Sequence, residues 1–356
     1  MNKNKDNNHY ISRFQLRRFL SVPPPDRPGK YYTWVYESSG AAFQENIRVA
    51  GSEHQFYGSD SDDLENLFSD KESKYGSIYA DIITDPSRVS KHKDELSDLF
   101  WVFGFRTRAI RERIRSSAIA TMGQAANSVD SDVAKNFFER EALRRVNEEI
   151  DARLGKMNVF ERIALKKTSK FQKELRLIPL KVRKLVANGS VGTVIRNGFL
   201  EVTSAVSYTK MLDEGHNNGL REFIAEGGRC PEKFRPLKWE VVASEQNEFV
   251  LGDSGPFALT ETLKEEPFVG VGEKLLEAYL PISPQLCLAA LFKSSAPHLT
   301  SSQIRKCTIS TSLENFFSHA EDDELKSLAK TTLGNATEII PADEIDEIIR
   351  KLWDRK

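Results

Sequence analysis

The stretch FVLGDSGPF, residues 249–257, sets the character of the C-terminal half of this chain. Its apolar first part is typical of a strand, and the Ser-Gly-Pro that follows Asp253 favours a turn. Asp253 therefore has two interpretations: a carboxylate held at a strand end for catalysis or ligand binding, or a turn residue that accepts a backbone hydrogen bond. Similar β-type runs lie around it, at residues 239–244, 257–260, 278–282, 286–292 and 306–310. Together they predict an antiparallel sheet.

The segments on either side of this section show mainly helical periodicity. Apolar residues recur at helical spacing over long runs, and Pro179 is expected to begin a new helix, where its missing N–H costs nothing. Aromatic and β-branched runs near the N-terminus are typical of strands. The predicted helices cover residues 64–83, 92–118, 132–186, 313–330 and 341–353, and the remaining predicted strands cover 30–37, 47–49 and 337–341.

The predicted fold class is α+β, with N-terminal extended strands, a helical middle, an antiparallel β-rich section and C-terminal helices. We expect residues 1–8 to be a disordered lead and residues 9–320 to form one domain. Within that domain the helical middle covers about 90–186 and the β-rich part about 190–310. Residues 321–356 are predicted to be a C-terminal helical extension.

The composition is that of an ordinary globular protein. Hydrophobic residues make up 39% of the 356, which is enough for a core, and the net charge of −1 gives no overall field that would recruit nucleic acid. The three cysteines form neither a C-x-x-C metal signature nor a disulfide framework. No apolar run approaches 18 residues, and the polar start lacks the apolar core of a signal peptide. We therefore expect a cytoplasmic protein without a transmembrane segment.

Four stretches, taken in order, carry a family resemblance. They are HYISRFQLRRF (9–19), the run from NIRVAGSEHQFYG to LENLFSDKESKYGSI (46–78), FGFRTRAIRERI (103–114), and FVLGDSGPF with LPISPQLCLAAL (249–291). Together they resemble the domain of unknown function 4238 family, a mostly bacterial group, over residues 9–320. The resemblance implies a fold and a set of positions, but no activity. Ser12 and Arg13 stand where the family commonly has Pro and Gln, and Gly255 lengthens the turn after Asp253.

His9 and Asp253 are the predicted catalytic residues. Imidazole titrates near neutral pH, so His9 suits general acid/base chemistry or metal binding, or else it only hydrogen-bonds a neighbouring element. Glu65 and Glu72 lie two helical turns apart and share a face. With Asp253 they form the predicted metal site, because carboxylates hold divalent cations; the alternative is a solvated acidic side of the helix.

Two arginines are predicted binding residues. Arg106 follows a run of aromatic residues typical of a buried helix, so it needs a carboxylate partner, for which Asp253 and Glu72 are candidates. Phosphate binding and a structural ion pair both remain open for it. Arg13, in the first family-like stretch, is grouped with Arg106 as a binding residue.

The stretch 156–184 is strongly basic, with ten Lys or Arg residues and two acidic ones. Its apolar residues recur at helical spacing, which predicts a pair of basic amphipathic helices. Lys166, Lys167 and Lys170 represent this surface among the predicted binding residues. It suits a nucleic-acid backbone, an anionic membrane surface or an acidic protein partner, and internal pairing with acidic regions is the alternative.

The motifs that identify common enzyme classes are absent from the sequence: there is no P-loop, no Rossmann glycine loop, no G-x-S-x-G and no H-E-x-x-H. The leading hypothesis is an intracellular bacterial hydrolase, of nuclease or phosphodiesterase type, that acts as a defence or toxic effector. A divalent cation is the candidate cofactor, and a phosphate-bearing ligand is the candidate substrate. The alternative is a non-catalytic module that binds nucleic acid or a protein through 156–184.

Overall fold

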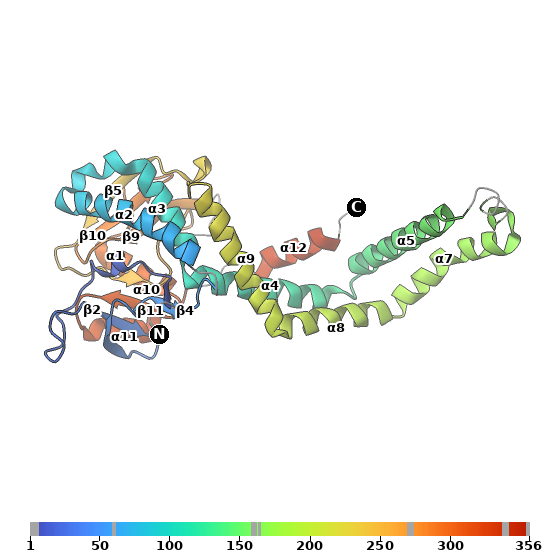
Figure 1. Cartoon of the computed structure of the whole chain (residues 1–356), viewed down its shortest axis with the longest axis horizontal. Coiled ribbons are helices and arrows are strands. Elements are labelled where there is room, and N and C mark those ends of the chain that lie inside the picture. The colour runs from blue at the N-terminus through green and yellow to red at the C-terminus, as the bar shows by residue number, and fades with distance from the viewer. Residues whose placement is uncertain are drawn as a thin grey trace. The chain divides into compact units, whose positions relative to one another are not determined.

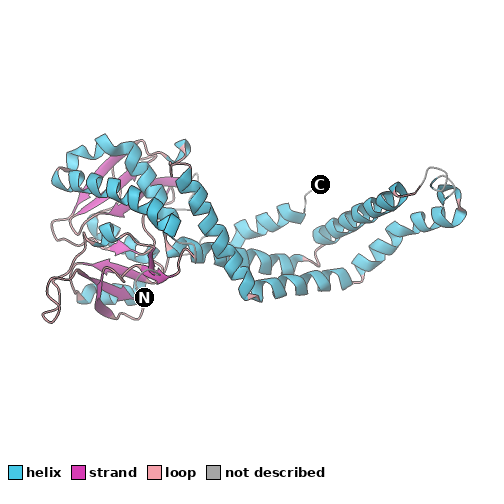
Figure 2. Ribbon diagram, viewed as in Figure 1, coloured by secondary structure: helices cyan, strands magenta, loops and turns pink. Residues whose placement is uncertain are grey.

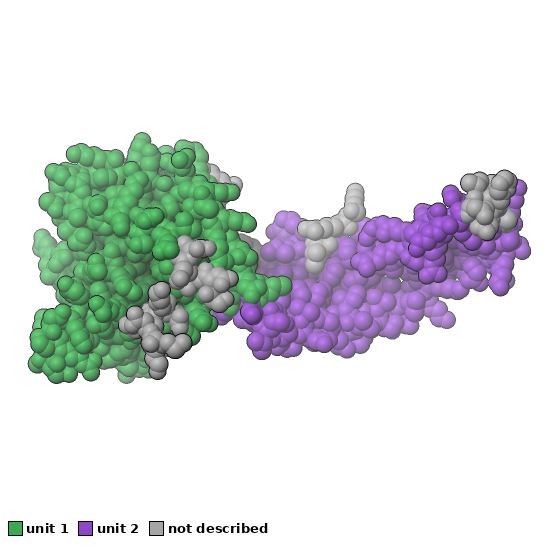
Figure 3. Space-filling view, viewed as in Figure 1, with its two compact units in different colours: residues 1–114, 211–339 green, residues 115–210, 340–356 purple. Residues whose placement is uncertain are grey.

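The computed structural model describes residues 7–58, 62–157, 162, 165–268, 274–336 and 342–353. The chain divides into two compact units, which have different colours in Figure 3. The first comprises residues 1–114 and 211–339, and the second comprises residues 115–210 and 340–356.

The first unit contains both helices and strands, many of which are labelled in Figure 1. Its N-terminal part contains β1 (Asn7–His9), α1 (Arg13–Leu16), β2 (Tyr32–Glu37), β3 (Ala42–Asn46), β4 (Ser52–His54), α2 (Asp62–Thr84), the 3-10 helix η1 (Pro86–His92), α3 (Lys93–Arg106) and the start of α4 (Arg108–Ser128). Its later part contains the end of α9 (Val206–Ala225), the 3-10 helix η2 (Glu232–Phe234), β5 (Lys238–Ala243), β6 (Leu251–Gly252), β7 (Phe257–Thr260), β8 (Glu265–Pro267), β9 (Leu275–Pro281), β10 (Leu286–Leu291), α10 (Ser301–Thr311), β11 (Asn315–Ser318) and α11 (Asp323–Thr332).

Among the described residues, the strands of this unit form three sheets, with every pairing antiparallel. The largest has the order β5-β10-β9-β7-β8, the second β3-β2-β11-β6, and β1 pairs with β4 alone. In the second sheet β11, from late in the chain, lies beside the N-terminal β2; both are labelled in Figure 1, and Figure 2 draws the strands in magenta. The predicted α+β class and the antiparallel sheets of the C-terminal half are confirmed.

One hydrophobic core joins α2, α3 and the five-stranded sheet. Leu64 and Phe68 of α2 and Phe100 of α3 are buried in it. Phe100 meets Trp239 of β5 edge-on, with ring centroids 4.8 Å apart. The apolar periodicity of 64–83 therefore marks the face that packs, which leaves the polar face of α2 available for other contacts.

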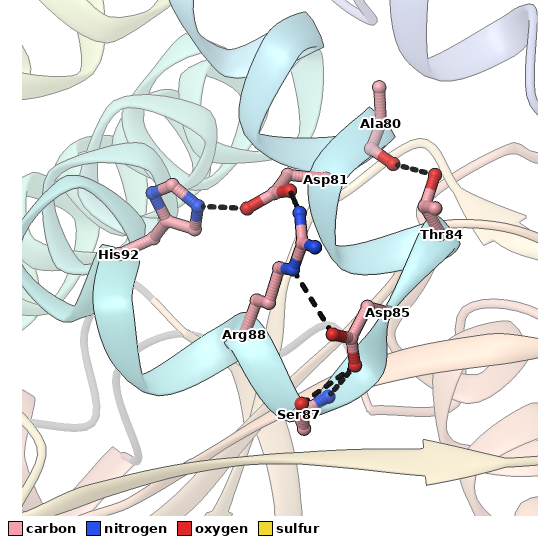
Figure 4. Close-up of polar contacts among 7 residues, drawn as sticks. All are labelled: Ala80, Asp81, Thr84, Asp85, Ser87, Arg88 and His92. Atoms are coloured by element: carbon pink, nitrogen blue, oxygen red, sulfur yellow. Dashed lines mark hydrogen bonds and ion pairs between the residues drawn. The ribbon is translucent and has the colours of Figure 1, made fainter.

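A polar junction fixes the turn from α2 through η1 into α3 (Figure 4). The Asp85 carboxylate caps η1 by accepting a hydrogen bond from the Ser87 N–H at 3.1 Å, and Arg88 donates to Asp85 at 3.1 Å and also to Asp81. The His92 ring contacts the other oxygen of Asp81 at 2.9 Å. Because Asp81 lies near the end of α2 and His92 directly precedes α3, these contacts hold the two helices that supply the site residues below.

The second unit is helical in its described part. It contains the remaining parts of α4 and α9 together with α5 (Asp132–Gly155), α7 (Ser169–Ala187), α8 (Ser190–Ser204) and α12 (Ala342–Trp353). Its core is smaller: Trp353 packs against Phe137 and Phe138 at ring-centroid distances of 5.4 and 5.3 Å, and Val182 and Val186 are buried in the same cluster. No helix in the described ranges combines the length and apolar character needed to cross a membrane.

Two predicted strands are wrong. Residues 47–49 form a turn between β3 and β4, and residues 306–310 belong to helix α10. In α10 the Thr300 side chain accepts from the Gln303 N–H while the Gln303 side chain accepts from the Thr300 N–H, a reciprocal cap that starts a helix. Buried Ile304 and Thr308 then follow four residues apart, on one helical face.

Several predicted helix boundaries also change. Residues 92–118 form two helices, because the extended backbone of Thr107 separates α3 from α4. Pro179 lies inside α7, exposed, and does not begin a helix. Residues 313–330 contain a strand, β11, before helix α11, because Phe316 and Phe317 are buried in the sheet between β2 and β6.

The two units divide the chain differently from the predicted ranges, and the predicted β-rich part does not begin at about 190, because residues 190–204 and 206–225 form helices α8 and α9. α11 belongs to the first unit and α12 to the second, whereas the prediction places both in one C-terminal extension. Asn7 and Asn8, predicted to be in the disordered lead, lie in β1. The predicted strand at 337–341 lies outside the described residues.

Candidate functional site

His9 is held at the end of β1 by a tight turn in a neighbouring segment. β1 pairs with β4, with His9 opposite Ser52, and the N–H groups of Tyr10 and Ile11 both donate to the Gly51 carbonyl at 3.0 and 3.1 Å. Gly51 has φ +64°, and a Cβ on it would lie 2.8 Å from Ile11 Cβ. Glycine is therefore required there for the N-terminal segment to pack this closely.

The His9 ring is only 4% exposed and makes two competing contacts. Its Nε2 lies 3.2 Å from the Ile47 carbonyl oxygen and 3.4 Å from Arg13 Nε. The first contact requires a proton on Nε2 and the second requires a lone pair, so the two contacts belong to different tautomers. Burial first, and the Arg13 charge second, lower the pKa of His9 from 6.5 to about 4. The imidazole is therefore neutral at pH 7.

Arg106, at the end of α3, binds the N-terminal segment to α2. Its Nε donates to the His9 carbonyl at 3.0 Å and to the Tyr57 hydroxyl at 2.8 Å. Its Nη1 donates to the Ser12 hydroxyl at 3.1 Å and forms an ion pair with Glu72. The guanidinium is 2% exposed, so this is a buried ion pair with additional hydrogen bonds.

Glu72 is thus the carboxylate partner of Arg106, which was one of the two predicted candidates. Ser12 also donates to Glu72 at 2.9 Å, so Ser12 joins the network even though it stands where the family commonly has proline. Tyr57 was not predicted as a site residue. Its partner Arg106 is 49 positions away, a separation that leaves no local pattern in the sequence.

Glu65 lies to one side of this network, and its carboxyl group is only partly hydrogen-bonded. Burial raises its pKa, while the Arg106 charge and hydrogen bonds from the Asn8 side chain and the His9 backbone lower it by smaller amounts. Its Oε1 is buried and has no hydrogen-bond partner in the described part of the chain. A buried carboxyl oxygen without a partner is costly, which marks it as a place for a ligand or water to bind.

These groups surround a small cavity of about 180 Å³, here called the His9 cavity, lined by His9, Arg13, Glu65, Ser69, Glu72 and Arg106. Five predicted site residues therefore come together: one imidazole, two carboxyls and two guanidinium groups. Glu65 and Glu72 do share one side of α2, as their spacing predicted.

Asp253 does not line this cavity. Its carboxylate accepts backbone hydrogen bonds from Leu313, Glu314 and Asn315 at 2.6, 2.8 and 2.9 Å, and so holds the segment that leads into β11. Both oxygens are occupied and the residue is 1% exposed. Gly255 adopts φ +70° in the turn that follows, where a Cβ would lie 3.0 Å from the Phe103 carbonyl.

The predicted metal site is not assembled in the described part of the chain. No group of three or more His, Cys, Asp or Glu side chains is placed there to hold a metal ion. Glu65 and Glu72 line the His9 cavity without Asp253, and Glu72 is already paired with Arg106.

The predicted basic surface lies in the second unit, whereas the His9 cavity lies in the first. Lys166, Lys167 and Lys170 are exposed. Other cations of the stretch are paired: Lys181 with Glu174 at 2.7 Å and Arg183 with Glu139 at 2.9 Å. Internal pairing, one of the predicted alternatives, thus accounts for part of the positive charge.

The chain matches the model of one protein family over residues 7–348, nearly its whole length. That family is described as a protein of unknown function (DUF4238), and the chain belongs to it. No curated protein and no solved structure matches the chain. The predicted family is confirmed, and the match begins within β1, two residues before His9.

Proposed function

We propose that this DUF4238 chain hydrolyses phosphodiesters in the His9 cavity, with His9 as general base and Glu65 as general acid. One observation supports this above all others: a neutral buried imidazole and a carboxyl with an unpartnered buried oxygen line the same cavity beside two guanidinium groups. Two titratable groups whose environments move their pKa values in opposite directions are a typical acid/base pair.

The proposed step transfers one proton at each side of phosphorus. As a water oxygen attacks phosphorus, a ring nitrogen of His9 accepts the proton that the water loses. The bond between phosphorus and the leaving oxygen breaks, and the protonated carboxyl of Glu65 supplies the proton that converts the leaving oxygen to an alcohol. The products are a phosphomonoester and an alcohol. Solvent returns a proton to Glu65 and removes one from His9.

The arginines have different proposed roles. Arg13 is exposed and lines the cavity, so its guanidinium is available to stabilise the charge that develops on the phosphoryl oxygens. Arg106 has both Nε and Nη1 engaged by protein oxygens, so we assign it a positioning role: it fixes the backbone of His9 and the carboxylate of Glu72.

The pKa directions predict an acidic working range. The base requires neutral His9, so activity should rise with pH through about 4. The acid requires protonated Glu65, whose pKa burial raises, so activity should fall again as Glu65 ionises. A bell-shaped pH profile of kcat/KM follows, and its acidic limb should be lost in any residual activity of a His9 variant.

The test is hydrolysis of bis(p-nitrophenyl) phosphate by the wild type, His9→Gln, Glu65→Gln and His54→Gln. His54 is exposed on β4, the strand that pairs with β1, so its variant is the matched histidine control. We expect rates to fall by about 100-fold or more in the first two variants and to stay within about twofold in the control.

Circular dichroism of each variant separates loss of chemistry from loss of fold. The proposal fails if the wild type shows no turnover between pH 4 and 8, or if both His9→Gln and Glu65→Gln retain full activity. The cytoplasmic location and the bacterial defence or toxic-effector role stay predictions.

A further inference from the structure

A second cavity, of about 370 Å³, adjoins the His9 cavity and is here called the cationic cavity. It is lined by Arg13, Arg17, Gly29, Lys30, Tyr31, Asn46, Ile47 and Arg48. Arg13 lines both cavities, and Ile47, whose carbonyl contacts the His9 ring, lines the second. A ligand that fills the cationic cavity therefore contacts Arg13, which also lines the His9 cavity.

Three separate segments build this cavity. Arg13 and Arg17 are four residues apart at α1, so they share a face, and the Arg17 N–H donates to the Arg13 carbonyl at 2.9 Å. The loop that enters β2 contributes Lys30, and the turn after β3 contributes Arg48. The Ile47 N–H donates to the Tyr31 carbonyl at 3.1 Å, which ties the last two segments together.

The charge of the cavity is entirely positive. Arg13, Arg17, Lys30 and Arg48 line it, and no acidic residue does. None of the four forms an ion pair with a carboxylate in the part of the chain that the structure describes. Elsewhere several surface arginines are paired, for example Arg108 with Glu314 and Arg235 with Asp94. Four gathered, unneutralised cations repel one another unless an anion binds among them.

Tyr31 adds an apolar surface to the cationic cavity. It is 59% exposed, although buried or half-buried residues follow it in β2. An exposed aromatic ring beside several cations is the combination by which proteins bind single-stranded nucleic acid: bases stack on the ring and the cations contact phosphates.

We propose that the cationic cavity anchors a single-stranded nucleic acid whose scissile phosphate lies in the His9 cavity, an inference that rests on the proposed hydrolase function. Arg17, Lys30 and Arg48 contact backbone phosphates next to the cleaved one, and a base stacks on Tyr31. A volume of about 370 Å³ accommodates a ligand of roughly nucleotide size and excludes a duplex, whose bases are already stacked and paired.

The cationic cavity differs from the basic stretch 156–184 in shape and in the side chains that it presents. The lysines there are exposed on helices, whereas the cationic cavity is concave and contains an aromatic ring. The two regions also offer matched variants. Arg17→Glu/Lys30→Glu/Arg48→Glu and Lys166→Glu/Lys167→Glu/Lys170→Glu make the same change in net charge.

The experiment measures binding by fluorescence anisotropy, with a fluorescein-labelled 12-nucleotide RNA and DNA of mixed sequence and their duplexes, at several salt concentrations. We expect the wild type to bind the single strands more tightly than the duplexes. The cationic-cavity triple variant should bind at least 10-fold more weakly, and its log Kd against log salt slope should fall by about 2, as expected when three phosphate contacts are lost from a single strand.

Three further variants make the result specific. Tyr31→Ala should weaken binding by about 5- to 100-fold with an unchanged salt slope, because stacking involves no counterion release. The Lys166/Lys167/Lys170 variant should bind within about twofold of the wild type. His54→Gln should bind like the wild type, because His54 lines neither cavity.

The outcomes separate this inference from the hydrolase proposal. If the wild type binds no single strand at 50 mM salt, or if only the 156–184 variant loses binding, the cationic cavity is not the anchor, even when bis(p-nitrophenyl) phosphate is hydrolysed. If the strands bind through Arg17, Lys30 and Arg48 but neither they nor the model diester are cleaved, the anchor stands and the hydrolase proposal falls.

Discussion

Asp253 and the His9 cavity are two buried polar regions of the same unit, and they differ in how fully their polar atoms are paired. The Asp253 carboxylate accepts three backbone hydrogen bonds and lines neither the His9 cavity nor the cationic cavity. In the His9 cavity, Glu65 keeps a buried oxygen without a described partner and the His9 ring has alternative contacts. Complete pairing indicates an architectural role, whereas incomplete pairing beside a cavity indicates a ligand site.

The two regions also differ in what their neighbours do. The partners of Asp253 are backbone N–H groups of the segment that leads into β11, so the carboxylate fixes the path of the chain. The partners of His9 and Glu65 include charged side chains, Arg13 and Arg106, that surround an open volume. The sequence pattern makes Asp253 and His9 equal candidates for catalysis. Their surroundings in the structure distinguish them, because His9, unlike Asp253, lines the His9 cavity together with charged side chains.

The largest stability effect should come from Asp253→Ala. Three buried or part-buried N–H groups lose their acceptor, so the free energy of unfolding should fall by about 4 kcal/mol. Denaturant unfolding of wild type and variant measures this, and Asp253→Asn, which keeps one acceptor oxygen, should lie between them. A variant that unfolds like the wild type but loses hydrolysis would reverse the comparison and make Asp253 catalytic.

The free energy of unfolding should depend on pH because His9 is buried. Its pKa is about 4 when folded and 6.5 when unfolded, so the unfolded state binds more protons between these values. Stability from this residue is therefore complete above pH 6.5 and decreases as the pH falls toward 4, by about 3 kcal/mol in total. The measurement is the difference between wild type and His9→Gln across pH 4 to 8. A difference that does not change with pH would mean that folding leaves the pKa of His9 unchanged.

The smallest expected effect is that of Glu65→Gln on stability. Burial disfavours the charged form of Glu65, so a neutral isostere should leave the free energy of unfolding at pH 7 unchanged or raise it by less than about 1 kcal/mol. Residues kept for function commonly lower the stability of the folded protein, whereas residues with an architectural role raise it. Thermal unfolding at pH 7 checks this, with Glu72→Gln as the contrast, since that change breaks the buried pair with Arg106. A loss with Glu65→Gln as large as with Glu72→Gln would place Glu65 among the architectural residues.

Much of the fold could be predicted from local pattern. The periodicity of 64–83 and the aromatic run at 30–37 correspond to α2 and β2, because each pattern shows which face of the element packs. The prediction failed where a partner outside the segment decides: residues 306–310 include β-branched side chains but follow a reciprocal helix cap, and residues 315–318 are held as a strand by Asp253 and β2.

The sequence by itself determined the α+β class, the family and most of the ionisable residues around the His9 cavity: His9, Arg13, Glu65, Glu72 and Arg106. Only the tertiary structure decided which of them meet, because the segments of 9–13, 65–72 and 106 are brought together by contacts across 34 to 97 positions. It also separated Asp253 from them and added Arg17, Lys30, Tyr31 and Arg48. Backbone partners and cavity walls come from distant parts of the chain, and no local spacing encodes them.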